Sequence, residues 1–160
     1  MVLRELKDKD AEYMLEWMHD ENVSGYLGKD FQHMTIENCK NFIEQSRSDK
    51  ENRHFAIVDE TDEYMGTISL KCIDEKAKRA EYAISCRTKA MGKGFARKAT
   101  EELFAIAKDM GLSVIYLNVY DYNIRAQKLY LKTGFCQTEK PGFIEEDCDE
   151  RLLWFQKELD

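Results

Sequence analysis

The hydrophobic period of the chain changes near residue 53, and this change restricts the possible folds more than any other feature. Three segments rich in β-branched and aromatic residues follow one another closely, at 53–59, 64–73 and 79–86. Such short connections suit antiparallel neighbours in a meander. The period then becomes helical from 94 to 110, and residues 112–119 indicate a buried strand. A strand–helix–strand unit adds a parallel pair, so we expect an α+β (mixed α/β) fold with a mostly antiparallel sheet.

The N-terminal part of the chain is mainly helical in pattern. Residues 2–7 indicate a short strand. Asp8 or Asp10 offers an N-cap for a first helix, and Thr35 offers one for a second. We expect the segment between them, residues 20–34, to be irregular, since it contains two glycines and no clear period.

The C-terminal part predicts one more helix and two more strands. The helix begins near Asn123 and ends at Gly134, and the strands fall at 135–140 and 151–157. In total we expect about six or seven strands flanked by about four helices. Because no linker or low-complexity run divides the chain, we expect residues 1–160 to form a single domain.

Composition excludes several classes of function. The formal net charge of −7 argues against nucleic-acid binding, which depends on cationic contacts to phosphate. The five cysteines show no Cys-x-x-Cys spacing, and the three histidines show no ligand spacing, so we expect no metal site. No apolar run approaches the ~20 residues of a membrane-spanning helix, and the charged N-terminus does not resemble a secretory signal. These features predict a cytoplasmic protein that does not bind membranes.

A glycine turn between a predicted strand and a predicted helix carries the first chemical signal. Its sequence, residues 91–96, is Met-Gly-Lys-Gly-Phe-Ala. Glycines let the backbone approach a ligand, and the free N–H groups that begin a helix favour phosphate. A turn that uses glycine for geometry alone is an open alternative. A Walker A loop is excluded because Gly94 follows Lys93, and a Rossmann loop is excluded because Arg97 occupies its third small position.

From about residue 79 to 136 the chain resembles the GCN5-related N-acetyltransferase (GNAT) superfamily. The phosphate loop of that family reads Arg/Gln-x-x-Gly-x-Gly/Ala and falls here on residues 91–96, with Met91 in place of the usual Arg or Gln. A second family signature falls on Leu117, Val119, Asn123, Arg125, Ala126, Leu129, Tyr130, Gly134 and Phe135.

The resemblance implies acetyl-CoA as the co-substrate and assigns residues to it. The loop amides would hold its pyrophosphate, and the strand that ends at 84–86 would pair with its pantetheine arm. The residues implied to contact acetyl-CoA are Ile84, Ser85, Cys86, Met91, Gly92, Lys93, Gly94, Phe95, Ala96, Arg97, Asn123, Arg125 and Tyr130. Each has a structural alternative, such as a core strand for 84–86 or a helix N-cap for Asn123.

The resemblance also implies the catalytic groups. Tyr130 would act as the general acid, since a phenol is protonated at neutral pH and can donate to a leaving thiolate; its alternative is a core aromatic. Glu81 is the first candidate for the general base, with a surface carboxylate as the alternative, and His33 is a weaker candidate. Cys86 is not favoured as a nucleophile, because no activating histidine pattern accompanies it.

The expected function is therefore transfer of an acetyl group from acetyl-CoA to a primary amine by direct attack. The acceptor classes left open are a small-molecule amine, an amino sugar and a protein N-terminus. The acidic loop 145–150 favours a cationic acceptor if it borders the site, although a solvated turn is the explanation that we prefer. A non-catalytic acyl-CoA-binding sensor module is the alternative function. A homodimer is common among similar proteins and is the oligomer we expect.

Overall fold

The structure, a computed structural model, describes residues 1–160 and contains one seven-stranded sheet in the order β1-β2-β3-β4-β5-β7-β6. The strands are β1 Leu3–Glu5, β2 Arg53–Val58, β3 Tyr64–Asp74, β4 Arg79–Cys86, β5 Val114–Tyr120, β6 Cys136–Thr138 and β7 Leu152–Glu158. The helices are α1 Ala11–Met18, α2 Glu21–Ser24, α3 Ile36–Ser46, α4 Phe95–Asp109 and α5 Ile124–Lys132. No helix is both long and apolar enough to span a bilayer.

The pairing of the strands confirms the predicted α+β fold. The three strands β2, β3 and β4 form the expected antiparallel meander, and β4 pairs with β5 in parallel through the α4 crossover. Every other pair in the sheet is antiparallel. The strand expected at 135–140 is shorter, at Cys136–Thr138, because the chain then leaves the sheet for a long loop.

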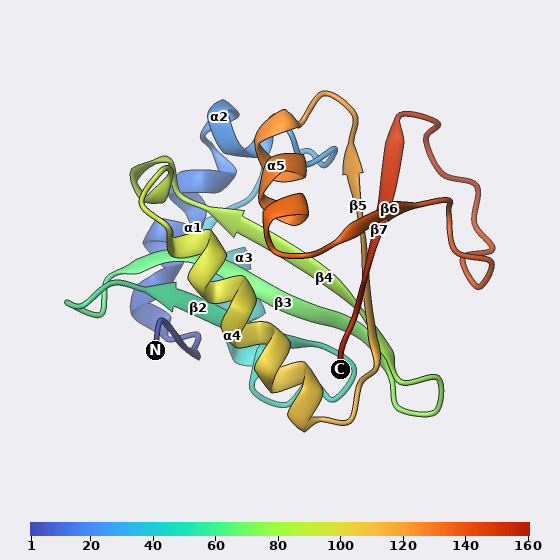
Figure 1. Cartoon of the computed structure of the whole chain (residues 1–160). Coiled ribbons are helices and arrows are strands. Elements are labelled where there is room, and N and C mark those ends of the chain that lie inside the picture. Colours follow the sequence, from blue (N-terminus) through green and yellow to red (C-terminus); the bar gives the residue numbers. More distant parts are fainter.

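The parallel pair separates after three residues. Pairing runs from Arg79 opposite Val114 only to Glu81 opposite Tyr116, although β4 continues to Cys86 and β5 to Tyr120. Figure 1 shows the two strands diverging toward their C-terminal ends, with α5 beside the opening. The sheet therefore has a gap in its middle, and strand backbone inside this gap lacks a strand partner.

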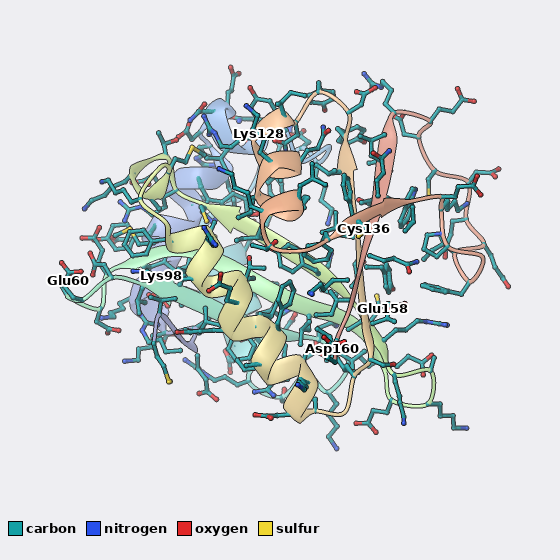
Figure 2. All side chains as sticks on the ribbon, viewed as in Figure 1. Glu60, Lys98, Lys128, Cys136, Glu158 and Asp160 are labelled. Carbon is teal, nitrogen blue, oxygen red and sulfur yellow. The ribbon has the colours of Figure 1, made fainter.

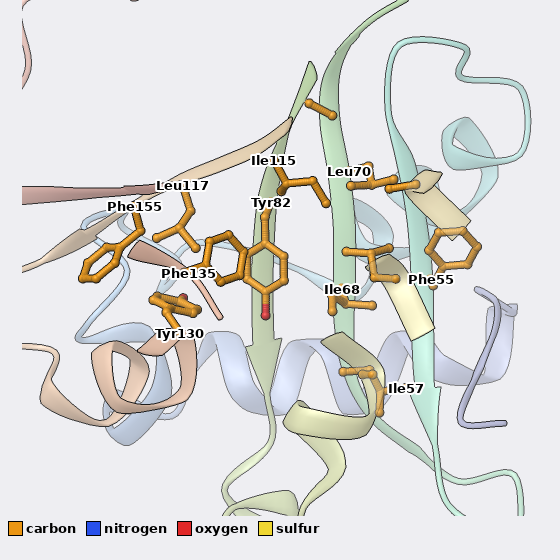
Figure 3. Close-up of a cluster of buried hydrophobic side chains, with 14 of the residues drawn as sticks. Phe55, Ile57, Ile68, Leu70, Tyr82, Ile115, Leu117, Tyr130, Phe135 and Phe155 are labelled. Carbon is orange, nitrogen blue, oxygen red and sulfur yellow. The ribbon is translucent and has the colours of Figure 1, made fainter. Parts of the chain in front are cut away.

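Helices cover both faces of the sheet. In Figure 1, α4 crosses the near face and α1 and α3 lie behind the sheet. The near side holds the larger apolar core, which joins α4 and α5 to the central strands; Figure 3 shows ten of its side chains by name. A second core packs α1 and α3 against β2 and β3. The sheet is thus buried on both faces, which holds the edges of the central gap in place.

Local signals placed most helix ends correctly. Thr35 caps α3 with a reciprocal bond to Asn38, and the Asn123 side chain accepts the N–H of Ala126 at the start of α5. The expected cap at Asp10 is wrong: its buried carboxylate accepts two bonds from Arg4 instead of bonding the helix amides. A short helix, α2, also lies within the segment 20–34 that was expected to be irregular.

A buried arginine ties the end of β4 to α1. The Arg87 guanidinium donates two bonds to Glu16 on α1, one to Glu63 and one to the carbonyl oxygen of Tyr64. It also lies 4.1 Å from the centre of the Tyr13 ring. Because an unpaired buried charge is costly, this set of bonds stabilises the relative position of α1 and the glycine turn that follows Arg87.

Candidate active site

The turn before α4 forms an open cradle of backbone N–H groups. Gly92 and Gly94 have φ angles of 76° and 84°, in the left-handed region that favours glycine, and no atom lies within 4 Å of a Cβ added at either position. None of the N–H groups from Gly92 to Arg97 donates a hydrogen bond to another residue. Because they lie at the positive end of a fifteen-residue helix, they fit a phosphate or pyrophosphate group.

Basic side chains surround this cradle. Lys93, Arg97 and Lys98 are exposed at the start of α4, and Arg125 is exposed at the start of α5. Lys98 and Lys128 are labelled on the two helices in Figure 2. The four basic side chains make the electrostatic potential around the cradle positive, although the protein as a whole is acidic.

Met91, which stands where the family usually has Arg or Gln, contacts side chains from α5 and α2. Its sulfur contacts the Arg125 guanidinium and the Asn22 side-chain amide, and its N–H bonds to Thr88. Arg125 therefore lies beside the position that the usual Arg or Gln side chain would occupy.

A cavity of about 410 Å³ lies beside the gap between β4 and β5. Five of the residues expected in the site line it: Glu81, Ile84, Ser85, Asn123 and Tyr130. Cys86, the glycine turn 91–97 and Arg125 do not line it. The candidate site therefore combines two features, the cavity beside the gap and the cradle of N–H groups at the start of α4.

The backbone of β4 presents free N–H groups to the gap. Arg87 donates its N–H to the carbonyl oxygen of Met65 on β3, and antiparallel pairing alternates from there back along the strand. The N–H groups of Ile84 and Cys86 therefore point away from β3, toward β5, where the strand pairing has already ended. Such unpaired donors suit a ligand amide or a developing oxyanion.

Tyr130 lies in the wall of the cavity with its hydroxyl free. Its ring packs edge-on against Tyr82, with 5.6 Å between the ring centroids. Figure 3 labels both side chains within the larger core. The side chain is 6% exposed, and its hydroxyl makes no hydrogen bond to the protein, yet no fully buried side-chain polar atom lacks a partner. The oxygen therefore reaches the cavity surface. Burial, and secondarily the nearby Cys86, raises the pKa of Tyr130, so the phenol keeps its proton at neutral pH.

Glu81 lies at the point where β4 and β5 begin to separate. Its carboxylate is 4.0 Å from the Lys71 ammonium on β3, and both side chains line the cavity. At ~3.3 Å per residue, Glu81 is roughly 10 Å along the strand from Ile84. A proton transfer between Glu81 and a group held at Ile84 would therefore require a bridging water.

Two candidates for the acceptor side lie away from the cavity. His33 does not line the cavity; it is exposed and pairs with Asp30, 3.3 Å away. No residue of the acidic loop 145–150 lines the cavity either. The β6–β7 loop instead packs through Phe143 onto Tyr116 and Arg79, so its acids face solvent. Cys86 has no histidine partner, and burial raises the pKa of its thiol to about 12, which opposes a nucleophilic role.

Much of the cavity lining has no signal in the sequence. His54 lines the cavity, bonds to Ser69 through Nδ1 at 2.6 Å and packs against the Phe42 ring. Burial lowers the pKa of His54, with Lys71 adding to the shift and Asp49 opposing it. These residues could be found only after packing placed α3 over β2 and β3. No cluster of three or more His, Cys, Asp or Glu side chains is arranged to hold a metal ion.

Comparison with known proteins agrees with this geometry. The acetyltransferase (GNAT) domain family matches residues 1–136. A Bacillus licheniformis protein called uncharacterized N-acetyltransferase p20 is 29% identical over 122 residues, 74% of this chain and 66% of that protein. Spermidine N(1)-acetyltransferase of Vibrio cholerae is 26% identical over 150 residues, 91% of this chain and 83% of that protein.

Solved structures support the same fold. A crystal structure of spermidine N-acetyltransferase from Vibrio cholerae, in complex with CoA and spermine, has a TM-score of 0.83 at 22% identity and covers 98% of this chain and 94% of that one. At this identity the likeness concerns the fold. The chain belongs to the GNAT acetyltransferase family, whose model matches most of its length. It is an acetyl-CoA-dependent N-acetyltransferase, and the cradle at 92–97 fits the pyrophosphate of that co-substrate.

Proposed function

We propose that the protein acetylates a primary amine by direct attack on the thioester of acetyl-CoA. The observation that supports this most strongly is the free Tyr130 hydroxyl, which reaches the cavity beside the gap between β4 and β5. Bound acetyl-CoA would supply an activated acetyl group on a thiol leaving group. The spermidine acetyltransferase of Vibrio cholerae shows amine acetylation in a relative.

The residues of the chain would divide the binding of acetyl-CoA between them. The N–H groups of residues 92–97, with Lys93, Arg97 and Arg125 beside them, hold the pyrophosphate. The strand amides of Ile84 and Cys86 hold the pantetheine arm and polarise the acetyl carbonyl. Asn123 both caps α5 and faces the cavity, so it can contact the same arm.

Two side chains would move the protons. Glu81 accepts a proton from the ammonium form of the acceptor through a water, which frees the nitrogen lone pair to bond to the acetyl carbon. Tyr130 then gives its proton to the leaving sulfur, which carries away the electron pair of the broken C–S bond. The second proton lost by the nitrogen restores the Tyr130 phenol through solvent.

The organisation of the protein is part of this proposal. We propose that residues 1–160 act as one acetyltransferase domain, since α1 to α3 and the C-terminal strands all contribute to the sheet or its two cores. A homodimer stays a prediction. A spermidine N-acetyltransferase of Vibrio cholerae is described as dodecameric in a solved structure.

Thiol release from acetyl-CoA tests the proposal. The enzyme function predicts release that depends on added primary amine and an acetylated amine found by mass spectrometry. A sensor module predicts a rise in melting temperature with acetyl-CoA but no amine-dependent release. The second result across a broad panel of amines would refute the enzyme function while preserving the binding site.

A further inference from the structure

The acceptor side of the cavity has an unexpected chemical character. Seven apolar side chains line it, from α1, from the segment between α2 and α3, and from α3. They are Met14, Trp17, Met18, Leu27, Phe31, Met34 and Phe42. Phe31 and Trp17 pack edge to face at 5.3 Å between centroids, which gives this wall an aromatic corner. Such a surface gains free energy by covering apolar groups of a ligand.

The charged groups of the cavity oppose a polycation. Glu81 is the sole acidic side chain that lines it, and Lys71 lies 4.0 Å from that carboxylate. Lys29 adds a second ammonium group to the lining, and the partial burial of the His54 ring lowers its pKa and so favours the neutral form. With one carboxylate and two ammonium groups in its lining, the cavity can accommodate at most one positive charge on a ligand and offers no partner to a second.

Carboxylates outside the cavity do not change this balance. Glu21 and Asp30 lie in a neighbouring surface depression, exposed to solvent, and Asp30 already pairs with His33. A polyamine places its second ammonium only a few carbon atoms from the reacting one. That second charge would fall inside the apolar wall, where burial of an unpaired charge is unfavourable.

We propose that the acceptor is a monoamine with an apolar, aromatic or branched aliphatic body, and that polyamines are poor acceptors. This substrate class rests on the proposed amine acetylation and narrows it. The reacting nitrogen faces the gap near Ile84 and Glu81, and the body of the acceptor lies against Trp17, Phe31 and Phe42. The expected preference for an apolar monoamine over a polyamine is opposite to the one suggested by the names of the similar spermidine acetyltransferases.

The test compares two sets of amines at saturating acetyl-CoA. Phenethylamine and isoamylamine represent apolar monoamines, and putrescine and spermidine represent polyamines. We expect kcat/KM to be at least ~10-fold higher for phenethylamine than for spermidine, as differences in apolar contact commonly produce. Equal or higher kcat/KM for spermidine would overturn the inference but leave the proposed function standing.

Two variants address the cause of the preference. Phe31→Ala removes part of the aromatic wall, so kcat/KM for phenethylamine should fall by roughly tenfold while the Kd of acetyl-CoA is unchanged. Asn38→Asp adds a carboxylate at the cavity and keeps the oxygen that accepts from Thr35 N–H and hydroxyl, so α3 keeps its cap. It should raise kcat/KM for spermidine relative to phenethylamine.

The remaining outcomes separate the two levels of the argument. An unaltered preference in both variants would overturn the inference, because the wall and its charge would then not select the acceptor. Binding of acetyl-CoA without turnover of the apolar amines would also overturn it. Failure to bind acetyl-CoA at all would instead overturn the proposed function.

Discussion

Tyr130 and Tyr82 form a natural pair for testing the general acid. The two rings touch edge-on and both are almost fully buried, but their hydroxyl groups differ. The Tyr82 hydroxyl forms a hydrogen bond of 2.7 Å with the Thr100 hydroxyl, whereas the Tyr130 hydroxyl has no protein partner. Removing each hydroxyl by substitution with Phe therefore separates catalysis from stability.

The structure sets the expected size of each effect. Tyr130→Phe breaks no hydrogen bond, so the free energy of unfolding should change by less than ~0.5 kcal/mol. Loss of a general acid typically lowers kcat by ~10²- to 10⁴-fold. Tyr82→Phe loses one buried bond, which should cost about 1 kcal/mol, while kcat should change by less than ~3-fold.

Thiol release under saturating substrates and thermal melting measure the two quantities. A stability loss of about 1 kcal/mol corresponds to roughly 2–4 °C in melting temperature for a chain of this size. If Tyr130→Phe retains kcat within ~3-fold of the wild type, Tyr130 is not the acid. If both variants lose activity equally, packing around the rings, rather than proton transfer, controls the rate.

Three further perturbations test other parts of the structure. Gly94→Ala and Gly111→Ala both force a side chain into a backbone with φ 84°, so each should lower the free energy of unfolding by about 1–2 kcal/mol in thermal denaturation. Only Gly94→Ala should raise the KM for acetyl-CoA, by about tenfold. Equal KM values in the two variants would contradict the role of the cradle in binding acetyl-CoA. Arg87→Met should lower the free energy of unfolding by about 2–3 kcal/mol in urea titration. Lys89→Met, at an exposed ion pair with the same Glu63, should leave the unfolding midpoint nearly unchanged. His54 has a lowered pKa in the folded protein, so below its usual value of 6.5 the unfolded chain binds a proton that the folded protein does not. Stability should therefore fall as the pH falls below 6.5, and His54→Gln should flatten that slope in melting curves.

Local patterns in the sequence predicted the elements well because their causes are local. The change of period near residue 53 marked the meander, and Thr35 and Asn123 marked helix starts through bonds to amides three residues away. The failed cap at Asp10 shows the limit of this approach. Its carboxylate has a stronger partner in Arg4, and that pair forms only when the first strand packs beside α1.

By itself, the sequence determined the turn at 91–97. A strand, two glycines with positive φ and a helix start are consecutive, so the direction of the free N–H groups follows from the backbone alone. The chemistry of the cavity, in contrast, depends on how distant segments pack together. Its wall comes from α1, the segment after α2, α3, α5 and five strands. Packing, rather than nearness in sequence, turns Trp17 and Phe31 inward and leaves the acidic loop 145–150 exposed to solvent.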